Sequence, residues 1–158
     1  IIPCKKIGRR TLYTVDSGGF ADTEDRDEDH TNMLCKFLRG CGGINAFVLT
    51  KNCADPRITK ETKEALKIYE DCFGADFYKH MIIVGSHADA DSTELDAWES
   101  DEIDLRAELV QALQLKRNKE LSKSDREGIP TIPIGVENFE EAVEEIHSLL
   151  KTKFSNKI

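Results

Sequence analysis

The chain has 158 residues, of which 39% are hydrophobic and 33% charged, so it is long enough for one globular domain with a buried core. Its net charge of −8 and pI near 5.1 argue against a general nucleic-acid binder. No apolar run reaches the length of a membrane span, and the first residues do not have the pattern of a signal peptide.

The number and spacing of the cysteines and histidines indicate whether the chain forms disulfides or binds zinc. The five cysteines include no Cys-x-x-Cys pair, and the four histidines include no His-x-x-x-His pair. We therefore expect free thiols in a reducing compartment and no zinc site.

Apolar residues recur with alternating strand and helix periods along the chain. Turn residues and helix caps separate these segments, with Thr59 as an expected N-cap and glycines as helix ends. The first expected elements are a hairpin of residues 1–6 and 11–15 and a helix that ends near Arg39, after an acidic loop over 21–30. A strand over 44–50, a helix over 59–74 and a strand over 81–85 follow. The last elements are a helix over about 103–121, a strand over 131–134 and a helix from Phe139.

This alternation predicts an α/β fold with a mostly parallel sheet and helices on both faces. Pro133 cannot donate a ladder hydrogen bond, so the strand over 131–134 is expected at an edge. Ligands of such sheets bind beyond the carboxyl ends of the strands. Those ends are Asp16–Gly19, Lys51–Asn52, Ser86–Asp89 and Gly135–Asn138.

Three of these ends carry polar residues in the order of the guanine-nucleotide-binding motifs. Asp-x-x-Gly begins at Asp16, Ser-His-x-Asp ends at Asp89, and Glu-Asn ends at Asn138. Each segment also has a plainer interpretation. Asp16 and its glycines satisfy a turn, Asp89 is one of several solvated acids, His87 is a loop residue, and Asn138 is a helix N-cap.

The chain as a whole resembles the immunity-associated GTPases (GIMAP or IAN proteins, AIG-type), relatives of the chloroplast outer-envelope import receptors. The resemblance runs from Thr11 to about Leu150. Its most specific part is the signature box between the third and fourth motifs of that family. The matching segments are Leu38-Arg39, Gly43-Ile44-Asn45-Ala46-Phe47-Val48-Leu49, Arg57-Ile58-Thr59-Lys60-Glu61, Phe73-Gly74 and His80-Met81-Ile82-Ile83-Val84.

The resemblance implies a P-loop-GTPase-like three-layer αβα fold that binds GTP or GDP with Mg²⁺. At the phosphate end, Asp16 would contact Mg²⁺ through water, and the Gly19 amide would bind the terminal phosphate as part of a switch. No residue of this chain is assigned a catalytic role. Phe20 stands where Ras-like enzymes place a water-orienting Gln. The family generally lacks that Gln, so hydrolysis would be slow or would borrow groups from a dimer partner.

At the base end, the resemblance assigns the carboxylate of Asp89 to the two N–H donors of guanine, an edge that adenine lacks. His87 replaces the Lys of ordinary GTPases, and its ring could lie over the purine. Ser86 belongs to the same motif, and Glu137 and Asn138 would lie beside the base in the last loop.

The sequence departs from this family in one large respect. It contains no G-x-x-x-x-G-K-[ST], so the phosphate-binding loop, its Lys and its Mg²⁺-binding hydroxyl are missing. We therefore expect a single incomplete G domain over residues 1–158. It would be truncated at its N-terminus, so that the first strand, the P-loop and the first helix of the family domain are absent. Its parts would be the hairpin and switch II start over 1–20, the family box and guanine motif over 44–89, and the last strand and helix over 131–153.

The missing strand would normally lie between the hairpin and the strand over 44–50. The hairpin strand Thr11–Val15 could pair directly with Ala46–Thr50, the hairpin could be loosely held, or the open edges could recruit another chain. We expect a fold less stable than the parent domain, with little nucleotide affinity. A smaller departure is Gly18, at a position where the family usually has proline. The glycine in place of proline loosens the switch.

Three functions remain open from the sequence. The first is a GIMAP-like GTPase domain impaired in nucleotide binding, and the second is a degenerate, nucleotide-free G domain that acts by protein–protein contact. The third is an α/β binder of another acidic ligand. The family resemblance also implies homodimer formation across the nucleotide face and a location in the cytoplasm or at a membrane surface.

Overall fold

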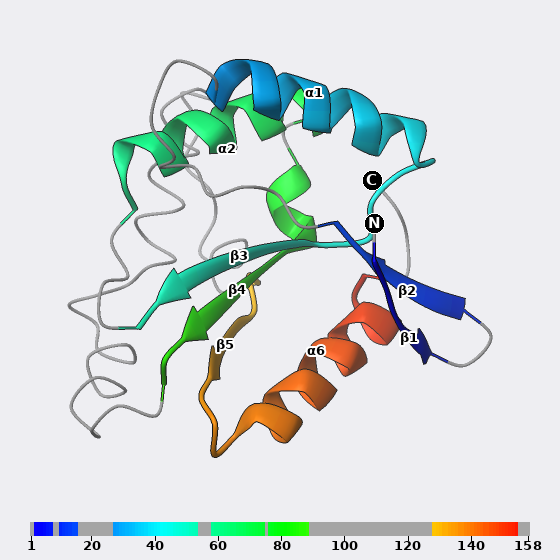
Figure 1. The fold of residues 1–158 in the computed structure, drawn as a ribbon, viewed down its shortest axis with the longest axis vertical. Coiled ribbons are helices and arrows are strands. Elements are labelled where there is room, and N and C mark those ends of the chain that lie inside the picture. The colour runs from blue at the N-terminus through cyan, green and yellow to red at the C-terminus, as the bar shows by residue number, and fades with distance from the viewer. Residues whose placement is uncertain are drawn as a thin grey trace.

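The computed structural model describes residues 2–7, 10–15, 27–53, 58–74, 76–88 and 128–154 (Figure 1). None of the helices within these described ranges is both long and apolar enough to cross a membrane. The described elements are the strands β1 (Ile2–Ile7) and β2 (Arg10–Thr14), the helix α1 (Asp27–Gly40), the strand β3 (Phe47–Asn52), the helix α2 (Lys60–Phe73), the 3-10 helix η1 (Phe77–His80), the strands β4 (Met81–Ser86) and β5 (Thr131–Ile134), and the helix α6 (Phe139–Thr152).

Strands β3, β4 and β5 form a parallel sheet in that spatial order. Phe47 pairs with Met81, and Ile83 pairs with Thr131. The central strand β4 is buried over five successive residues, as expected for a strand covered on both faces. As predicted, the strand with Pro133 lies at an edge of this sheet, where the proline costs no ladder hydrogen bond.

The two faces of β4 contact different helices, because successive side chains of a strand point to opposite sides. Met81 and Ile83 belong to the core on the α2 side, whereas Ile82 and Val84 pack with Ala142 of α6. Figure 1 shows the resulting layers, with α1 and α2 on one side of the sheet and α6 on the other. The predicted α/β arrangement is therefore present in the described residues.

Helix α2 begins and ends where the sequence predicts. Thr59 is its N-cap, and its hydroxyl accepts a hydrogen bond from the Thr62 amide at 3.3 Å. Gly74 ends the helix with φ +87°, a conformation that an L side chain rarely adopts. The face between these caps buries Ala65, Leu66 and Tyr69.

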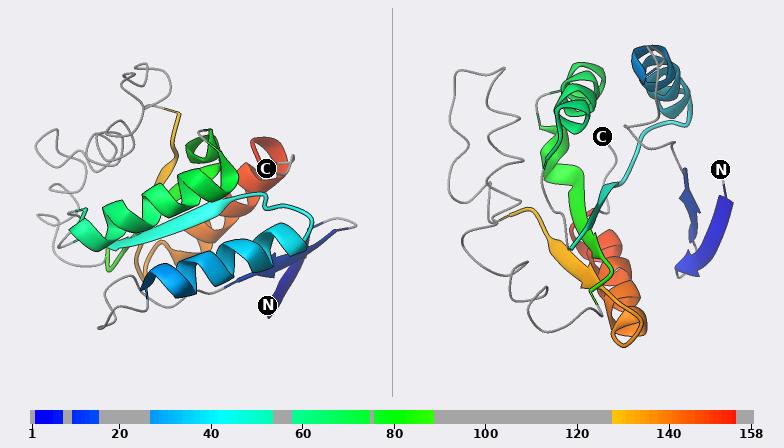
Figure 2. Two further views of the ribbon diagram at one scale, coloured as in Figure 1. Left: turned by 90° about the horizontal axis from the view of Figure 1, so that it is seen from above. Right: turned by 60° about the vertical axis from the view of Figure 1, so that its left-hand side comes forward.

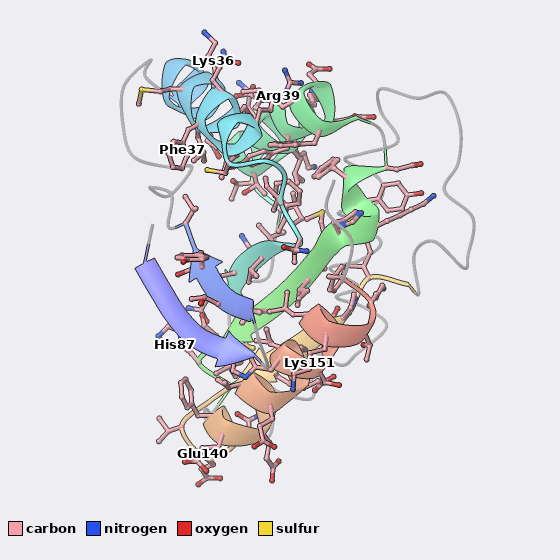
Figure 3. The ribbon with its side chains drawn as sticks, turned by 90° about the vertical axis from the view of Figure 1, so that its right-hand side faces the viewer. Lys36, Phe37, Arg39, His87, Glu140 and Lys151 are labelled. Atoms are coloured by element: carbon pink, nitrogen blue, oxygen red, sulfur yellow. The ribbon has the colours of Figure 1, made fainter. Side chains whose placement is uncertain are left out.

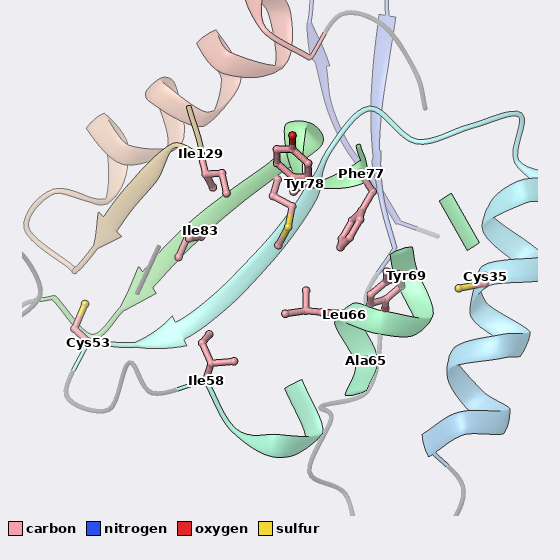
Figure 4. Packing of buried hydrophobic residues seen from close by; sticks show 11 residues of the cluster. Cys35, Cys53, Ile58, Ala65, Leu66, Tyr69, Phe77, Tyr78, Ile83 and Ile129 are labelled. Carbon is pink, nitrogen blue, oxygen red and sulfur yellow. The ribbon is translucent and has the colours of Figure 1, made fainter. Parts of the chain in front are cut away.

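The aromatic ring of Phe47, at the start of β3, joins the elements of the larger core. Its centroid lies 5.7 Å from that of Tyr69, 5.1 Å from Phe73 and 5.8 Å from Phe77. These separations suit tilted and edge-to-face aromatic packing. Figure 4 shows Tyr69 and Phe77 within this cluster, close to the buried strand β4.

The segment before β3 fixes the far end of α6. The Asn45 side-chain amide donates to the Phe154 carbonyl at 3.0 Å, and His80 Nδ1 lies 3.1 Å from the Asn45 carbonyl. Phe154 itself is fully buried. Several residues of the predicted family box thus have a structural role, since they hold the sheet and its two helix layers together.

The hairpin forms as predicted, with β1 antiparallel to β2 and an irregularity between Pro3 and Lys5. It remains a separate two-stranded sheet, so β2 does not pair with β3 in the described structure. Figure 2 shows the hairpin to one side of the three-stranded sheet. Of the arrangements open from the sequence, direct pairing of Thr11–Val15 with Ala46–Thr50 is therefore wrong.

Two element boundaries differ from the expectation. Helix α1 begins at Asp27, inside the stretch predicted as an acidic loop, because its acidic first residues Asp27, Glu28 and Asp29 suit the positive end of the helix dipole. Strand β3 begins at Phe47 rather than Ile44 and extends to Asn52, because its partner β4 runs to Ser86 and fixes the register. The helix predicted over about 103–121 lies outside the described residues.

Candidate functional site at the carboxyl edge of the sheet

The carboxyl ends of the three parallel strands lie together at one edge of the sheet. Asn52 pairs with Ser86, and Ser86 pairs with Ile134, so the loops that follow these residues start side by side. Two of the loops carry residues predicted to bind a nucleotide. The fold therefore brings the start of the Ser86–Asp89 motif beside the Gly135–Asn138 loop.

Hydrogen bonds hold the end of β4 to both neighbouring strands. On one side, the Cys53 amide donates to the Ser86 carbonyl at 2.9 Å, and the Ser86 hydroxyl donates to the Lys51 carbonyl at 3.3 Å. On the other side, the Ala88 amide donates to the Ile134 carbonyl at 3.2 Å. Ser86 is thus engaged with the strand next to it, and Ala88 extends the sheet pairing beyond the end of β4.

His87 lies between these anchors in an unusual backbone conformation. Its φ of 62° is the only positive value at a non-glycine position in the described part of the chain. Histidine is one of the few residues enriched in this left-handed region, where a side chain costs of order 1 kcal/mol or more. The imidazole is exposed, and its Nδ1 lies 3.1 Å from the Ser86 hydroxyl (Figure 3). The hydrogen bonds of the neighbouring residues Ser86 and Ala88 hold the His87 backbone at the edge of the sheet.

The side chain of Asn138 organises the loop after β5. Its Oδ1 accepts from the Gly135 amide at 2.7 Å, and its Nδ2 donates to the Pro133 carbonyl at 3.0 Å. Asn138 precedes the first residue of α6, but its side chain makes no capping hydrogen bond to that helix. Asn138 therefore occupies the predicted N-cap position of α6 without a side-chain cap, since both polar atoms of its amide bind backbone groups earlier in the loop.

The rest of this loop is exposed and carries both acidic and apolar groups. Val136 is 84% exposed and Phe139 is 55% exposed, so two apolar side chains lie at the surface here. Glu137 and the first-turn residues Glu140 and Glu141 are also exposed, and Figure 3 shows Glu140 at the start of α6. This surface offers carboxylates and apolar contacts, so it suits a flat ligand with N–H donors better than a phosphate.

Other predicted site residues lie outside the described part of the chain, namely Asp16, Gly19 and Asp89. Among the residues that the structure describes, no three His, Cys, Asp or Glu side chains are close enough together to hold a metal ion. The described site is therefore the base end of the predicted constellation, formed by Ser86, His87, Glu137 and Asn138.

Sequence reasoning missed the backbone contact between Ala88 and Ile134, which sets the two loops side by side. Neither residue carries a side chain that signals such a role. The contact could have been inferred from the strand order, because the carboxyl ends of adjacent parallel strands lie at the same edge of a sheet.

A comparison with protein families matched residues 5–119 to the AIG1 family, whose GTPases generally bind GTP or GDP with Mg²⁺. Comparisons with curated proteins and with solved structures each gave no match. The family match covers most of the chain and implies a P-loop GTPase-like fold, in agreement with the parallel sheet between helix layers. The chain therefore belongs to the AIG1 family and contains a GTPase-type domain.

Proposed function

We propose that residues 1–158 are an incomplete G domain of a GIMAP-like GTPase and that the loops after β4 and β5 hold its guanine base. The observation that carries this proposal is the hydrogen bond from the Ala88 amide to the Ile134 carbonyl at 3.2 Å. It sets His87 beside the loop that contains Glu137 and Asn138. Membership of the AIG1 family supports a guanine nucleotide as the ligand.

Each base-side residue has a distinct task in this proposal. The Asp89 carboxylate accepts two hydrogen bonds from guanine, and it would be left unpaired against adenine. The His87 ring stacks on the purine, a contact worth about 1–3 kcal/mol for an aromatic residue. Ser86 and Asn138 position the loops through their own hydrogen bonds, which leaves Glu137 at the rim of the site.

The phosphate end is expected to bind weakly. Asp16 would hold Mg²⁺ through water, which shields phosphate charge, and Gly19 would donate its amide to the terminal phosphate. The sequence contains no G-x-x-x-x-G-K-[ST], so it lacks the backbone amides and the Lys that normally hold the phosphates. We infer that the base contributes most of the affinity in this chain.

A second candidate is a nucleotide-free G domain that acts by protein contact. The separate hairpin favours it, because β3 then pairs with β4 alone among the described strands. Val48, near the start of β3, is 53% exposed, so the apolar surface of this edge strand is not fully covered by the described chain. Such an edge accepts a further strand.

The first candidate also includes pairing of two copies across the nucleotide face. Sedimentation of the chain with and without GDP would test this pairing.

A titration of GDP and ADP into the 158-residue chain, followed by nuclear magnetic resonance, separates the candidates. The first predicts that GDP binds at least about tenfold more tightly than ADP, a difference of about 1.4 kcal/mol. Asp89→Asn should remove this preference, whereas Asp91→Asn, which removes the same charge nearby, should keep it. Equal binding of both nucleotides contradicts the guanine site, and a folded chain that binds neither supports the interaction module.

A further inference from the structure

Two cysteines, one on each helix, lie in the core where α1 and α2 pack together. Cys35 of α1 is 2% exposed and belongs to the core on the α2 side of the sheet. Cys72, in the last turn of α2, is half-buried and packs against the same core. Figure 4 shows the Cys35 side chain directed from α1 toward α2. Contact with the Cys72 thiol contributes to the raised pKa of Cys35, in agreement with this shared packing.

A second contact fixes the two helices at this position. Arg39 lies one turn after Cys35, and its Nε donates to the Cys72 carbonyl at 2.9 Å. The Arg39 Nη2 donates to the same carbonyl. This carbonyl is among the last of α2, which have no partner within the helix. Arg39 therefore holds the end of α2 against α1 and keeps Cys72 beside Cys35.

We propose that Cys35 and Cys72 form a reversible intramolecular disulfide that links α1 to α2 when a low-molecular-weight disulfide such as oxidised glutathione is present. The Cys72 thiolate attacks one sulfur of the glutathione disulfide, forms a mixed disulfide and releases one glutathione thiolate. Cys35 then loses its proton and attacks the Cys72 sulfur, which forms the protein disulfide and releases the second glutathione. The two cysteines together lose two electrons, and the oxidant gains them.

The order of attack follows from exposure and acidity. Cys72 is reached first because Cys35 is almost completely buried. Burial, followed by the contact with Cys72, raises the pKa of the Cys35 thiol to about 12, so this sulfur is a poor initial nucleophile. The Arg39 charge acts in the opposite direction and lowers the pKa of Cys35, which assists the second step.

The disulfide would restrict α1 relative to α2. Helix α1 is the first described element after Asp16–Gly19, the segment assigned to the phosphate switch. An effect of oxidation on nucleotide binding therefore rests on the proposed function, whereas formation of the disulfide does not. Direct detection of the disulfide, with no measurement of nucleotide binding, therefore tests its formation separately from the proposed function.

The test is oxidation of the folded chain in a series of glutathione redox buffers, followed by acid quenching and mass spectrometric mapping of unreduced peptides. The expected main product is a linked peptide pair containing Cys35 and Cys72. Its fraction should depend on the square of the reduced glutathione concentration, as an intramolecular disulfide requires. Circular dichroism before oxidation confirms that each variant is folded.

Three variants sharpen this experiment. Cys35→Ala, which keeps an apolar group in the core, should trap glutathione on Cys72, and Cys72→Ser should leave Cys35 reduced. Cys41→Ser removes an exposed thiol from the end of the same helix and should retain the linked peptide. The proposal is overturned if folded wild-type chain accumulates glutathione on Cys72 while Cys35 stays reduced, or if neither cysteine is oxidised.

Discussion

The Asn138 side chain and the Gly135 amide form a 2.7 Å hydrogen bond that closes the loop between β5 and α6. The same side chain donates to the Pro133 carbonyl at 3.0 Å, so one amide group uses both of its ends within its own loop. The loop is therefore held in one shape before any ligand arrives. Such preorganisation reduces the entropy cost of binding.

Replacement of Asn138 tests this loop arrangement. Asn138→Ala removes both hydrogen bonds and leaves the Gly135 amide without its acceptor, so we expect a loss of about 1–3 kcal/mol in the free energy of unfolding. Asn138→Asp keeps an acceptor for Gly135 and loses the donor to Pro133, so its loss should be smaller. Urea unfolding measures both values. Equal stability of Asn138→Ala and wild type would show that the loop does not depend on this side chain.

The backbone of His87 can be tested separately from its imidazole. Asparagine tolerates a positive φ, whereas alanine pays the cost of the left-handed conformation. We expect His87→Asn to match wild-type stability within about 0.5 kcal/mol and His87→Ala to be less stable by about 1 kcal/mol. Thermal unfolding gives the comparison. If the ring stacks on a purine, both variants should also bind GDP less tightly, and by similar factors.

Burial distinguishes the central strand from the edge strand. Ile83 of β4 is fully buried, so Ile83→Ala should leave a cavity and cost about 2–5 kcal/mol. Val48 of β3 is 53% exposed, and Val48→Ala should cost less than about 1 kcal/mol. Denaturant midpoints of the two variants check this difference. A large loss at Val48 would indicate that another chain covers this edge in solution.

Thr59 offers a test of a local sequence signal. Its hydroxyl caps α2 through the Thr62 amide, so Thr59→Ala should destabilise the chain by about 1 kcal/mol. Thr59→Ser keeps the hydroxyl and serves as the matched control. Hydrogen exchange at the first amides of α2 reports the effect directly, and unchanged exchange in Thr59→Ala would argue against the cap.

The raised pKa of Cys35 predicts a loss of stability at alkaline pH. In the unfolded chain this thiol has the ordinary cysteine pKa of 9.0, whereas burial raises the pKa in the folded state to about 12. The folded state therefore binds more protons than the unfolded state between these values, so stability falls as pH rises through this window. The maximal slope is about 1.4 kcal/mol per pH unit.

Urea unfolding at pH 8 and pH 10, relative to Cys35→Ala, isolates the contribution of this thiol. We expect wild type to lose about 1 kcal/mol more than this variant over that interval, once the titration of other groups cancels in the comparison. Cys41→Ala provides a control for an exposed cysteine on the same helix. Identical pH profiles for wild type and Cys35→Ala would show that the Cys35 thiol does not titrate differently in the two states.

The sequence by itself determined the local elements and their faces. The apolar run over 81–85, the Thr59 cap and the glycine at position 74 depend on nearby residues, and the described structure contains them as predicted. The alternation of strands and helices was enough to predict a parallel sheet, because side-chain periodicity and backbone preference are local properties of the chain. The resemblance of the segments between Leu38 and Val84 to a family signature box, together with the order of the motifs, was enough to suggest the family.

Only the tertiary structure decided which distant groups meet. The Ala88–Ile134 and Arg39–Cys72 hydrogen bonds connect residues that are far apart in the sequence, and the hairpin is kept separate from β3. Backbone amides are alike at every residue, so no local pattern marks the ones that pair across strands. Their partners depend on strand order and helix packing, and these are set by burial of the whole core.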